Sequence, residues 1–345
     1  MGAKKSGKSP NSISDILTKD LIIYFWAKLR GQKYAFVSNH IYTMFKDLEN
    51  ITYKQILLLG LLILIGLIVF AGGGMLLANL FWSSEDIIAA QSGIIDSPAR
   101  ISFMKYFHFM SMFGTFFFPA VALSLLAKSY NFSFLYINQG VDSKKVIMIF
   151  AMILILLPII NFLAIWNQGL HLPEFMSGLE QWMNDKEAQL TEITEKFMLT
   201  TSIGGLIINI LIMAVLPALS EEFIFRGILM KWFNKSMGIH LSIVLSAIIF
   251  SAIHIQFLGF FPRFFLGIVL GYVFYWSGSL WASILLHFLN NAMIVTTYFL
   301  VARGIINVNP DTVGTIDNTA MLLLNILIFG ALMYWFYRNR VKFRL

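Results

Sequence analysis

Six polar residues in the C-terminal half of the chain carry groups that can move protons and stabilise negative charge. In chain order they are Glu221, Glu222, Arg226, His254, His287 and Asn291. Two neighbouring carboxylates compete for ionisation in an apolar site, and an adjacent imidazole can share a proton with one of them. This combination suits a general base that activates a water molecule. An imidazole and an amide one helical turn apart could donate hydrogen bonds to a developing oxyanion.

Helical spacing indicates how the two acids divide their roles. Glu222 and Arg226 are four residues apart on one helical face and can form an ion pair, whereas Glu221 points about 100° away from Glu222. One carboxylate can therefore be held by the arginine while the other remains free for proton transfer. The alternative is an ion-pair cluster that only locks the helices together, and the two histidines count against it.

The surroundings of these residues are those of a membrane protein. Of the 345 residues, 58% are hydrophobic and only 12% are charged, with a mean hydropathy of +0.75, whereas about 25% of residues are charged in an ordinary soluble domain. Because a helix needs about 20 apolar residues to cross a bilayer, the sequence predicts an all-α, polytopic transmembrane helix bundle of about eight spans. The predicted spans are 55–81, 103–127, 146–166, 198–233 (broken at Pro217), 239–258, 261–277, 280–301 and 319–337.

Helix rise places the polar residues at similar depths. At about 1.5 Å per residue, Glu222 lies about 18–20 Å before the polar turn at 234–238, and His254 lies about 24 Å beyond it. His287 and Asn291 lie about 12–20 Å from the next turn on the same side. Charged groups at such depth cost about 2.5–3.5 kcal/mol each, so they are expected to face a protein interior or a wet cavity. We therefore expect these side chains to converge in one buried, hydrated pocket.

The distribution of basic residues predicts the orientation. With the N-terminus assigned to the cytoplasm, all but six of the 25 Lys and Arg residues fall on the cytoplasmic side, as the positive-inside rule requires. The six exceptions are Arg100, Lys105, Lys186, Lys196, Arg263 and Arg303. We expect a multi-pass protein of the cell membrane with both termini cytoplasmic, and we interpret Arg263 as an interfacial, snorkelling side chain. Topology then explains the net charge of +7, so no nucleic-acid partner is expected.

The chain divides into a short arm and a membrane domain. Residues 1–53 are expected to form a basic cytoplasmic or peripheral arm on an anionic surface of the lipid bilayer, and residues 54–345 the membrane domain, with its catalytic core at about 198–301. Residues 172–196 combine acids with apolar residues at helical spacing, which predicts an amphipathic helix outside the bilayer. Cysteine is absent, which excludes disulfides and thiolate chemistry. The remaining histidines are interpreted as structural or exposed: His40, His108, His171 and His240.

The arrangement of the six residues resembles that of the CAAX-prenyl-protease and bacteriocin-processing (CPBP) family of glutamic-type intramembrane proteases. The three family motifs, EExxxR, FxxxH and HxxxN, occur complete and in order at residues 221–226, 250–254 and 287–291. The resemblance covers about residues 200–295. It implies an intramembrane endopeptidase whose substrate is a membrane protein or peptide, cut near the cytoplasmic side of the membrane.

The resemblance also implies a role for each residue. These roles are activation of the hydrolytic water by Glu221 with His254, stabilisation of the oxyanion by His287 and Asn291, and support of the site by Glu222 and Arg226. No cofactor is assigned. In an older interpretation of such sites, a zinc ion is bound by Glu221, His254 and His287, and these residues are a chemically reasonable ligand set. The sequence therefore does not decide between a metal-dependent and a glutamate-based mechanism.

Two other classes of function stay open at this point. Buried acids and histidines also form proton relays, so a proton- or ion-coupled transporter is one alternative, although no internal repeat is evident. A catalytically silent scaffold or immunity protein that keeps the same fold is the other. Other intramembrane protease classes are disfavoured because the chain contains no HExxH, GxGD or GxSG sequence.

Overall fold

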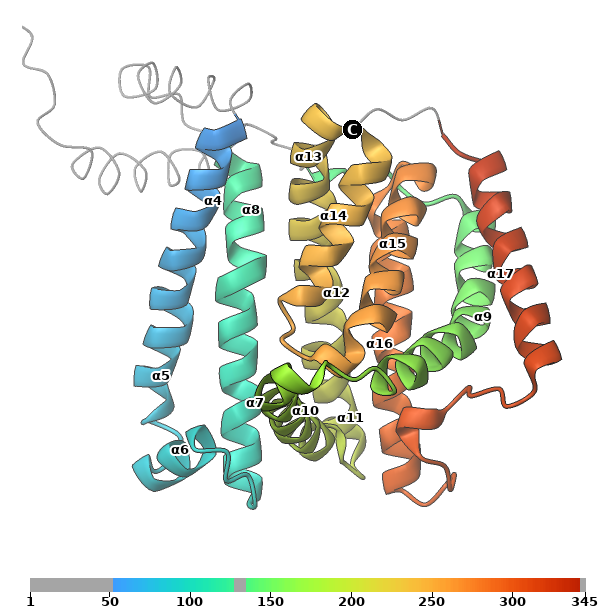
Figure 1. Ribbon diagram of the computed structural model, residues 1–345. Coiled ribbons are helices and arrows are strands. Elements are labelled where there is room, and N and C mark those ends of the chain that lie inside the picture. The colour runs from blue at the N-terminus through green and yellow to red at the C-terminus, as the bar shows by residue number, and fades with distance from the viewer. Residues whose placement is uncertain (1–51, 127–134, 342–345) are drawn as a thin grey trace, which may run out of the picture.

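The computed structural model describes residues 52–126 and 135–341, and every regular element in these residues is a helix (Figure 1). The elements before residue 200 are α4 (Thr52–Gly66), η2 (Leu67–Gly72), α5 (Gly73–Ala78), α6 (Ser84–Gln91), α7 (Pro98–Met112), η3 (Phe113–Phe117), α8 (Phe118–Leu126), α9 (Ser143–Gln168), η5 (Glu174–Met176) and α10 (Ser177–Met198). After it come α11 (Ile203–Ile210), η6 (Leu211–Val215), α12 (Leu216–Glu222), η7 (Phe223–Leu229), α13 (Met230–Met237), α14 (Ile239–Ala252), η8 (Phe257–Gly259), α15 (Phe260–Ser277), α16 (Leu280–Ala302), η9 (Pro310–Thr312) and α17 (Thr319–Arg338). The predicted all-α class is confirmed, whereas the predicted arm at 1–53 lies almost wholly outside the described residues.

Seven helices of the described chain are long and apolar enough to cross a membrane. They run over Tyr53–Ala78, Pro98–Leu126, Ser143–Gln168, Ile203–Met237, Phe257–Ser277, Leu280–Ala302 and Thr319–Arg338. A shorter apolar helix, α14, lies among them. The prediction of a helical bundle of about eight spans is therefore confirmed.

The first two spans form an antiparallel pair at one side of the bundle, blue and blue-green in Figure 1. Their backbones meet at Gly66 and Gly114, where a Cβ atom added to Gly66 would lie only 1.9 Å from the carbonyl oxygen of Gly114. No side chain fits at that distance, so glycine at both positions sets the spacing of the two helices. Through η3 and α8 this pair packs on the helix that carries the two glutamates.

The span from Ile203 to Met237 carries Glu221 and Glu222, and it is continuous. The predicted break at Pro217 is wrong, because the chain stays helical through that residue. A π-helical turn, η6, ends two residues before Pro217, and a second, η7, directly follows Glu222. Wider π turns rearrange the backbone bonding that a proline interrupts, and they often occur at functional sites. The two acids therefore sit on a short α-helical segment between two π turns.

Helix α14 ends earlier than predicted. It stops at Ala252 rather than at 258, so its 14 residues extend about 21 Å, less than the thickness of a bilayer core. The chain then turns at residues whose side chains are partly exposed, with Ile255 in the left-handed region at φ 54°, a costly conformation for a β-branched residue. Asn167 of α9 holds this turn, since its side chain accepts from the Phe261 N–H and donates to the Phe257 carbonyl.

Several connections of the bundle meet at one end. The Leu280 N–H bonds to the Tyr136 carbonyl, and the Val341 N–H bonds to the Trp276 carbonyl, so the α15–α16 connection lies beside the start of α9 and the end of α17. Figure 1 shows the α13–α14 connection at the same end. The predicted amphipathic helix is present as α10, and it lies toward the opposite end, against α7, η8 and α16 (Figure 1).

Candidate active site

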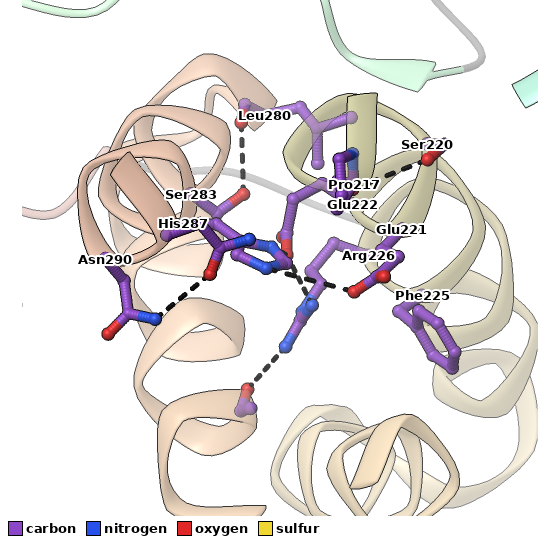
Figure 2. A network of polar contacts seen from close by, with 12 residues as sticks. Pro217, Ser220, Glu221, Glu222, Phe225, Arg226, Leu280, Ser283, His287 and Asn290 are labelled. Atoms are coloured by element: carbon purple, nitrogen blue, oxygen red, sulfur yellow. Dashed lines mark hydrogen bonds and ion pairs between the residues drawn. The ribbon is translucent and has the colours of Figure 1, made fainter. Parts of the chain in front are cut away.

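A buried network of charged groups joins three spans (Figure 2). Arg226 donates through Nη1 to Glu222 Oε1, and the same oxygen lies 3.0 Å from His287 Nδ1. The second guanidinium nitrogen of Arg226 donates to the carbonyl oxygen of Gly267 at 2.9 Å. Because Glu222 and Arg226 are almost fully buried, each would be very costly without its partner. The network therefore ties α15 and α16 to the helix that carries the acids, and the predicted Glu222–Arg226 pair is confirmed.

Glu221 is also buried but has a different environment. Its Oε2 lies 3.8 Å from His287 Nε2, and among the described residues no other basic group comes within ion-pair distance. Figure 2 shows Glu221 and Glu222 on the same helix, opposite His287. His287 thus stands between the two carboxylates, with Nδ1 toward Glu222 and Nε2 toward Glu221. The predicted division, one acid held by Arg226 and the other outside that pair, matches this geometry.

His254 lies in the turn after α14, with one ring nitrogen fixed. Its Nδ1 is 2.8 Å from the carbonyl oxygen of Phe250. A carbonyl oxygen only accepts, so Nδ1 carries the hydrogen, and in the neutral ring Nε2 has the free lone pair. The Phe250 ring contacts both imidazoles and the Arg226 guanidinium, with centroid distances of 5.2 Å to His254, 5.8 Å to His287 and 4.9 Å to Arg226 Cζ. The phenylalanine of the second motif therefore packs between the charged network and His254.

Asn291 follows His287 by one turn of α16. Its side-chain oxygen accepts a hydrogen bond of 3.1 Å from Asn290 Nδ2. That bond orients the amide and leaves the N–H groups of Asn291 available on the other side. Asn290 is itself buried, so it acts as a support that the sequence pattern alone does not single out.

The four residues to which the sequence assigns catalytic roles line one cavity. It has a volume of about 460 Å³ and is lined by Glu221, His254, His287 and Asn291 together with apolar side chains of α7, α10 and α16. This size lies in the range of ordinary ligand sites. His254 and Glu221 share the cavity without a direct hydrogen bond between them in the described chain. A water molecule or a substrate group between the two side chains would contact both.

The residues do not form a ready metal site. Within the described part of the chain, no three His, Cys, Asp or Glu side chains cluster so that they could hold a metal ion. The zinc set considered above, Glu221, His254 and His287, is thus not assembled in this arrangement. Both imidazoles use Nδ1 for protein contacts, so a metal would have to draw their Nε2 atoms together.

Arg263 occupies a different place from the one predicted for it. The interpretation as an interfacial snorkelling side chain is wrong, because Arg263, in the first turn of α15, lines the cavity that holds Glu221 and is held there by other residues of the chain. The guanidinium is held by Gln256, a second cavity residue that the sequence analysis missed. A basic residue directly after a proline in an apolar stretch is the only sequence signal for it.

The other histidines differ in their surroundings. His171 is largely exposed and pairs with Glu180 at 2.8 Å, and His240 bonds to the Tyr272 hydroxyl at 2.8 Å. These two match the interpretation as structural or exposed residues, whereas His40 falls outside the described residues. His108 lines the cavity of Glu221 and contacts the edge of Phe197.

Comparison with known proteins finds a family model that matches the segment carrying this site. The family model described as type II CAAX prenyl endopeptidase Rce1-like matches residues 203–293, a segment that contains all six motif residues. No curated protein and no solved structure matches the chain. The matched segment begins with α11 and ends in α16, so it spans the elements that build the cavity. Through these residues the chain is similar to the Rce1-like type II CAAX prenyl endopeptidases, a family of peptide hydrolases.

Proposed function

We propose that this protein is an intramembrane endopeptidase in which Glu221 and His254 activate the attacking water. One observation carries the proposal: Glu221, His254, His287 and Asn291 line a single cavity, while Glu222 and Arg226 pair with each other outside it. A site that only locked helices would not need a second buried acid outside that pair. The family supports peptide hydrolysis in general, and the roles of the individual residues are part of the proposal.

Water activation uses two groups that line the same cavity, Glu221 and His254. The Glu221 carboxylate accepts a proton from a bound water, and the Nε2 lone pair of His254 accepts a hydrogen bond from the same water or takes the proton onward. The water oxygen then attacks the carbonyl carbon of the peptide bond. The proton returns to the leaving amine, which frees the new amino terminus. Proton transfer of this kind typically contributes about 10²–10⁴-fold to the rate.

The oxyanion site uses groups on one face of α16. His287 donates through Nδ1 to Glu222, and as an imidazolium it also presents an N–H at Nε2. In that state Arg226 and His287 balance the charges of the two glutamates. The Nε2–H of His287 and the Asn291 amide, one helical turn apart, then donate to the oxygen that becomes negative. Each such donor is typically worth about 10²–10³-fold in turnover.

The position of the cut bond follows from the depth of the site. His287 lies seven residues after the start of α16, which is about 10 Å below the α15–α16 connection. With the orientation predicted from the basic residues, that connection faces the cytoplasm. The cleaved bond would lie near the cytoplasmic end of a membrane segment or in the tail next to it.

The test is cleavage by the purified full-length protein in liposomes. The probe is a pool of synthetic single-span membrane peptides with short tails, and products are read by mass spectrometry with and without a chelator. We expect cleavage by the wild type and by Glu192→Gln, an exposed control on α10, and none by Glu221→Gln. The same liposomes, loaded with a pH-sensitive dye, test the transporter alternative. Proton flux that Glu221→Gln abolishes, without any cleavage, would overturn the proposal.

A further inference from the structure

The active-site cavity adjoins a second cavity of equal size. The second cavity also has a volume of about 460 Å³ and lies between α9, α10, α15 and α16. Six residues line both cavities: Thr194, Gln256, Arg263, Leu266, Asn290 and Ile294. Because the lining is shared, a substrate bound over Glu221 can extend past these six residues into the second cavity. Arg263 is the one basic residue of the described chain in this shared wall.

Hydrogen bonds and packing hold the Arg263 guanidinium in one orientation, as expected of a group that binds a ligand. Nη1 and Nη2 donate to the side chain and the carbonyl oxygen of Gln256. The plane of the guanidinium packs on Gly259, where an added Cβ atom would lie 2.6 Å from Nη1. Nε is buried and has no hydrogen-bond partner among the described residues. Gln256 and the bare backbone of Gly259 therefore fix the direction in which the guanidinium presents its charge.

The charge of Arg263 is not neutralised by a direct ion pair. Glu221 and Glu187 both act on it electrostatically, but in the described chain neither carboxylate comes within ion-pair distance of it. Glu187 projects from α10 into the second cavity and accepts the Leu258 N–H at 3.4 Å. Burial raises the pKa of the Glu187 carboxyl, and Arg263 and the Leu258 N–H oppose that rise. A half-buried guanidinium with two acids near it and none in contact leaves room for a further anion.

We propose that Arg263 is a specificity-determining residue that binds a carboxylate of the peptide substrate where the two cavities meet. The proposal rests on the proposed endopeptidase function, since it places this carboxylate on a peptide whose cleaved bond lies at Glu221. A planar guanidinium suits a carboxylate because it can donate two parallel hydrogen bonds. Glu187 is the carboxylate of α10 that acts electrostatically on Arg263, and it competes with the substrate group.

The carboxylate has two possible sources on a peptide, a free C-terminus or an Asp or Glu side chain. Three lipid-anchored probes separate them: dodecanoyl-Ala-Leu-Ala as the free acid, the same peptide as a carboxamide, and dodecanoyl-Ala-Leu-Glu as a carboxamide. Binding to the purified full-length protein is measured by microscale thermophoresis. A binding measurement needs no turnover, so its outcome is independent of whether the peptide pool described above is cleaved.

We expect the wild type to bind at least one carboxylate probe about 10- to 100-fold more tightly than the plain carboxamide, the range for a hydrogen bond to a charged group. Preference for the free acid alone identifies a C-terminus, and equal preference for the glutamate probe identifies carboxylates in general. Arg263→Gln should abolish the preference and leave carboxamide affinity unchanged, whereas Arg263→Lys should keep part of it. Glu187→Gln should strengthen binding of the carboxylate probes only.

Two matched controls and one repositioning variant complete the test. Arg303→Gln and Glu192→Gln, both exposed, should bind all probes as the wild type does. Gly259→Ala keeps the charge of Arg263 but displaces its guanidinium, so it should also weaken the preference for carboxylate probes. This variant replaces Arg263→Gln in the test if Arg263→Gln fails to fold. The proposal is overturned if the wild type shows no preference, or if Arg263→Gln weakens binding of the acid and the carboxamide equally.

Discussion

Glu221 and Glu222 are neighbours in the chain but have different surroundings. Glu222 is held by Arg226 and by His287, whereas Glu221 faces a cavity and lies 3.8 Å from His287. The difference arises because adjacent residues on a helix point about 100° apart. One acid therefore serves the structure, and its neighbour is placed where it can exchange a proton.

The first prediction at the residue scale concerns Arg226. Arg226→Leu leaves the Glu222 carboxylate buried without its guanidinium partner, and breaking a buried pair in this way typically costs about 3–5 kcal/mol. We expect a clear fall in the unfolding temperature of the purified protein, followed by intrinsic fluorescence in detergent. Arg303→Leu, at an exposed arginine, is the control and should unfold as the wild type does. Equal unfolding temperatures for the two variants would mean that the buried network does not support the fold.

Single residues were predictable where a short motif identifies them. The six motif residues were indicated by their types and spacing and by the resemblance to a known family, and four of them line the cavity as expected. Arg263 and Gln256 were not predictable as cavity residues, because their position depends on where α14 stops. Apolar residues continue beyond Ala252 as far as Leu258, so hydropathy extended the predicted span past the turn that carries His254 into the cavity. The support that Asn290 gives to Asn291 likewise depends on side-chain direction.

At the scale of elements, three of the π turns in the described chain lie around the site, and a further one, η2, lies in the first span. The acids lie between the π turns η6 and η7, and a third π turn, η3, packs on α12 from the first helix pair. Hydropathy predicted the long spans well because burial in lipid needs only length and apolar composition. It could not predict π turns, and it overestimated the effect of Pro217, since a local change of helix type accommodates the missing N–H.

A prediction at this scale concerns the contact between the first two spans. Gly66→Ala places a Cβ atom 1.9 Å from the carbonyl oxygen of Gly114, and a backbone carbonyl cannot move aside without shifting its helix. Overpacking typically costs about 1–3 kcal/mol and more where the backbone must move. We expect a lower unfolding temperature for Gly66→Ala. Gly60→Ala is the matched control on the same helix, because no atom lies within 4 Å of the added carbon; if the control loses as much stability, the contact with Gly114 is not the cause.

The whole molecule is a bundle with two adjoining cavities inside and an acidic helix beside them. Helix α10 contributes Glu187, Thr191 and Thr194 to one cavity, and Thr194 and Met198 to the other. The sequence predicted that helix and its amphipathic character. It could not predict that the helix would line the cavities, because a hydrophobic face indicates burial but does not identify the partner.

Orientation in the membrane is a prediction that belongs to this scale, and cysteine accessibility can test it. The chain has no native cysteine, so a single introduced thiol is the only target of a membrane-impermeant reagent. Ser279 is buried and is a poor site, whereas Ser236 and Asn138 are exposed near the end assigned to the cytoplasm. We expect Ser236→Cys and Asn138→Cys to react only after lysis, and Ser84→Cys, exposed on α6 at the opposite end, to react in intact cells. The reverse pattern would invert the topology.

The central claim is that Glu221 and His254 act together on one water molecule, and the rates of two single variants and their double variant test it most directly. With any peptide that the wild type cleaves, single-turnover rates are measured for Glu221→Gln, His254→Ala and the double variant. We predict that each single change lowers the rate by about 10²–10⁴-fold, and that the double variant is little slower than either one, since residues that act as a unit lose activity non-additively. A single variant that keeps most of the wild-type rate, or losses that multiply in the double variant, would contradict the account.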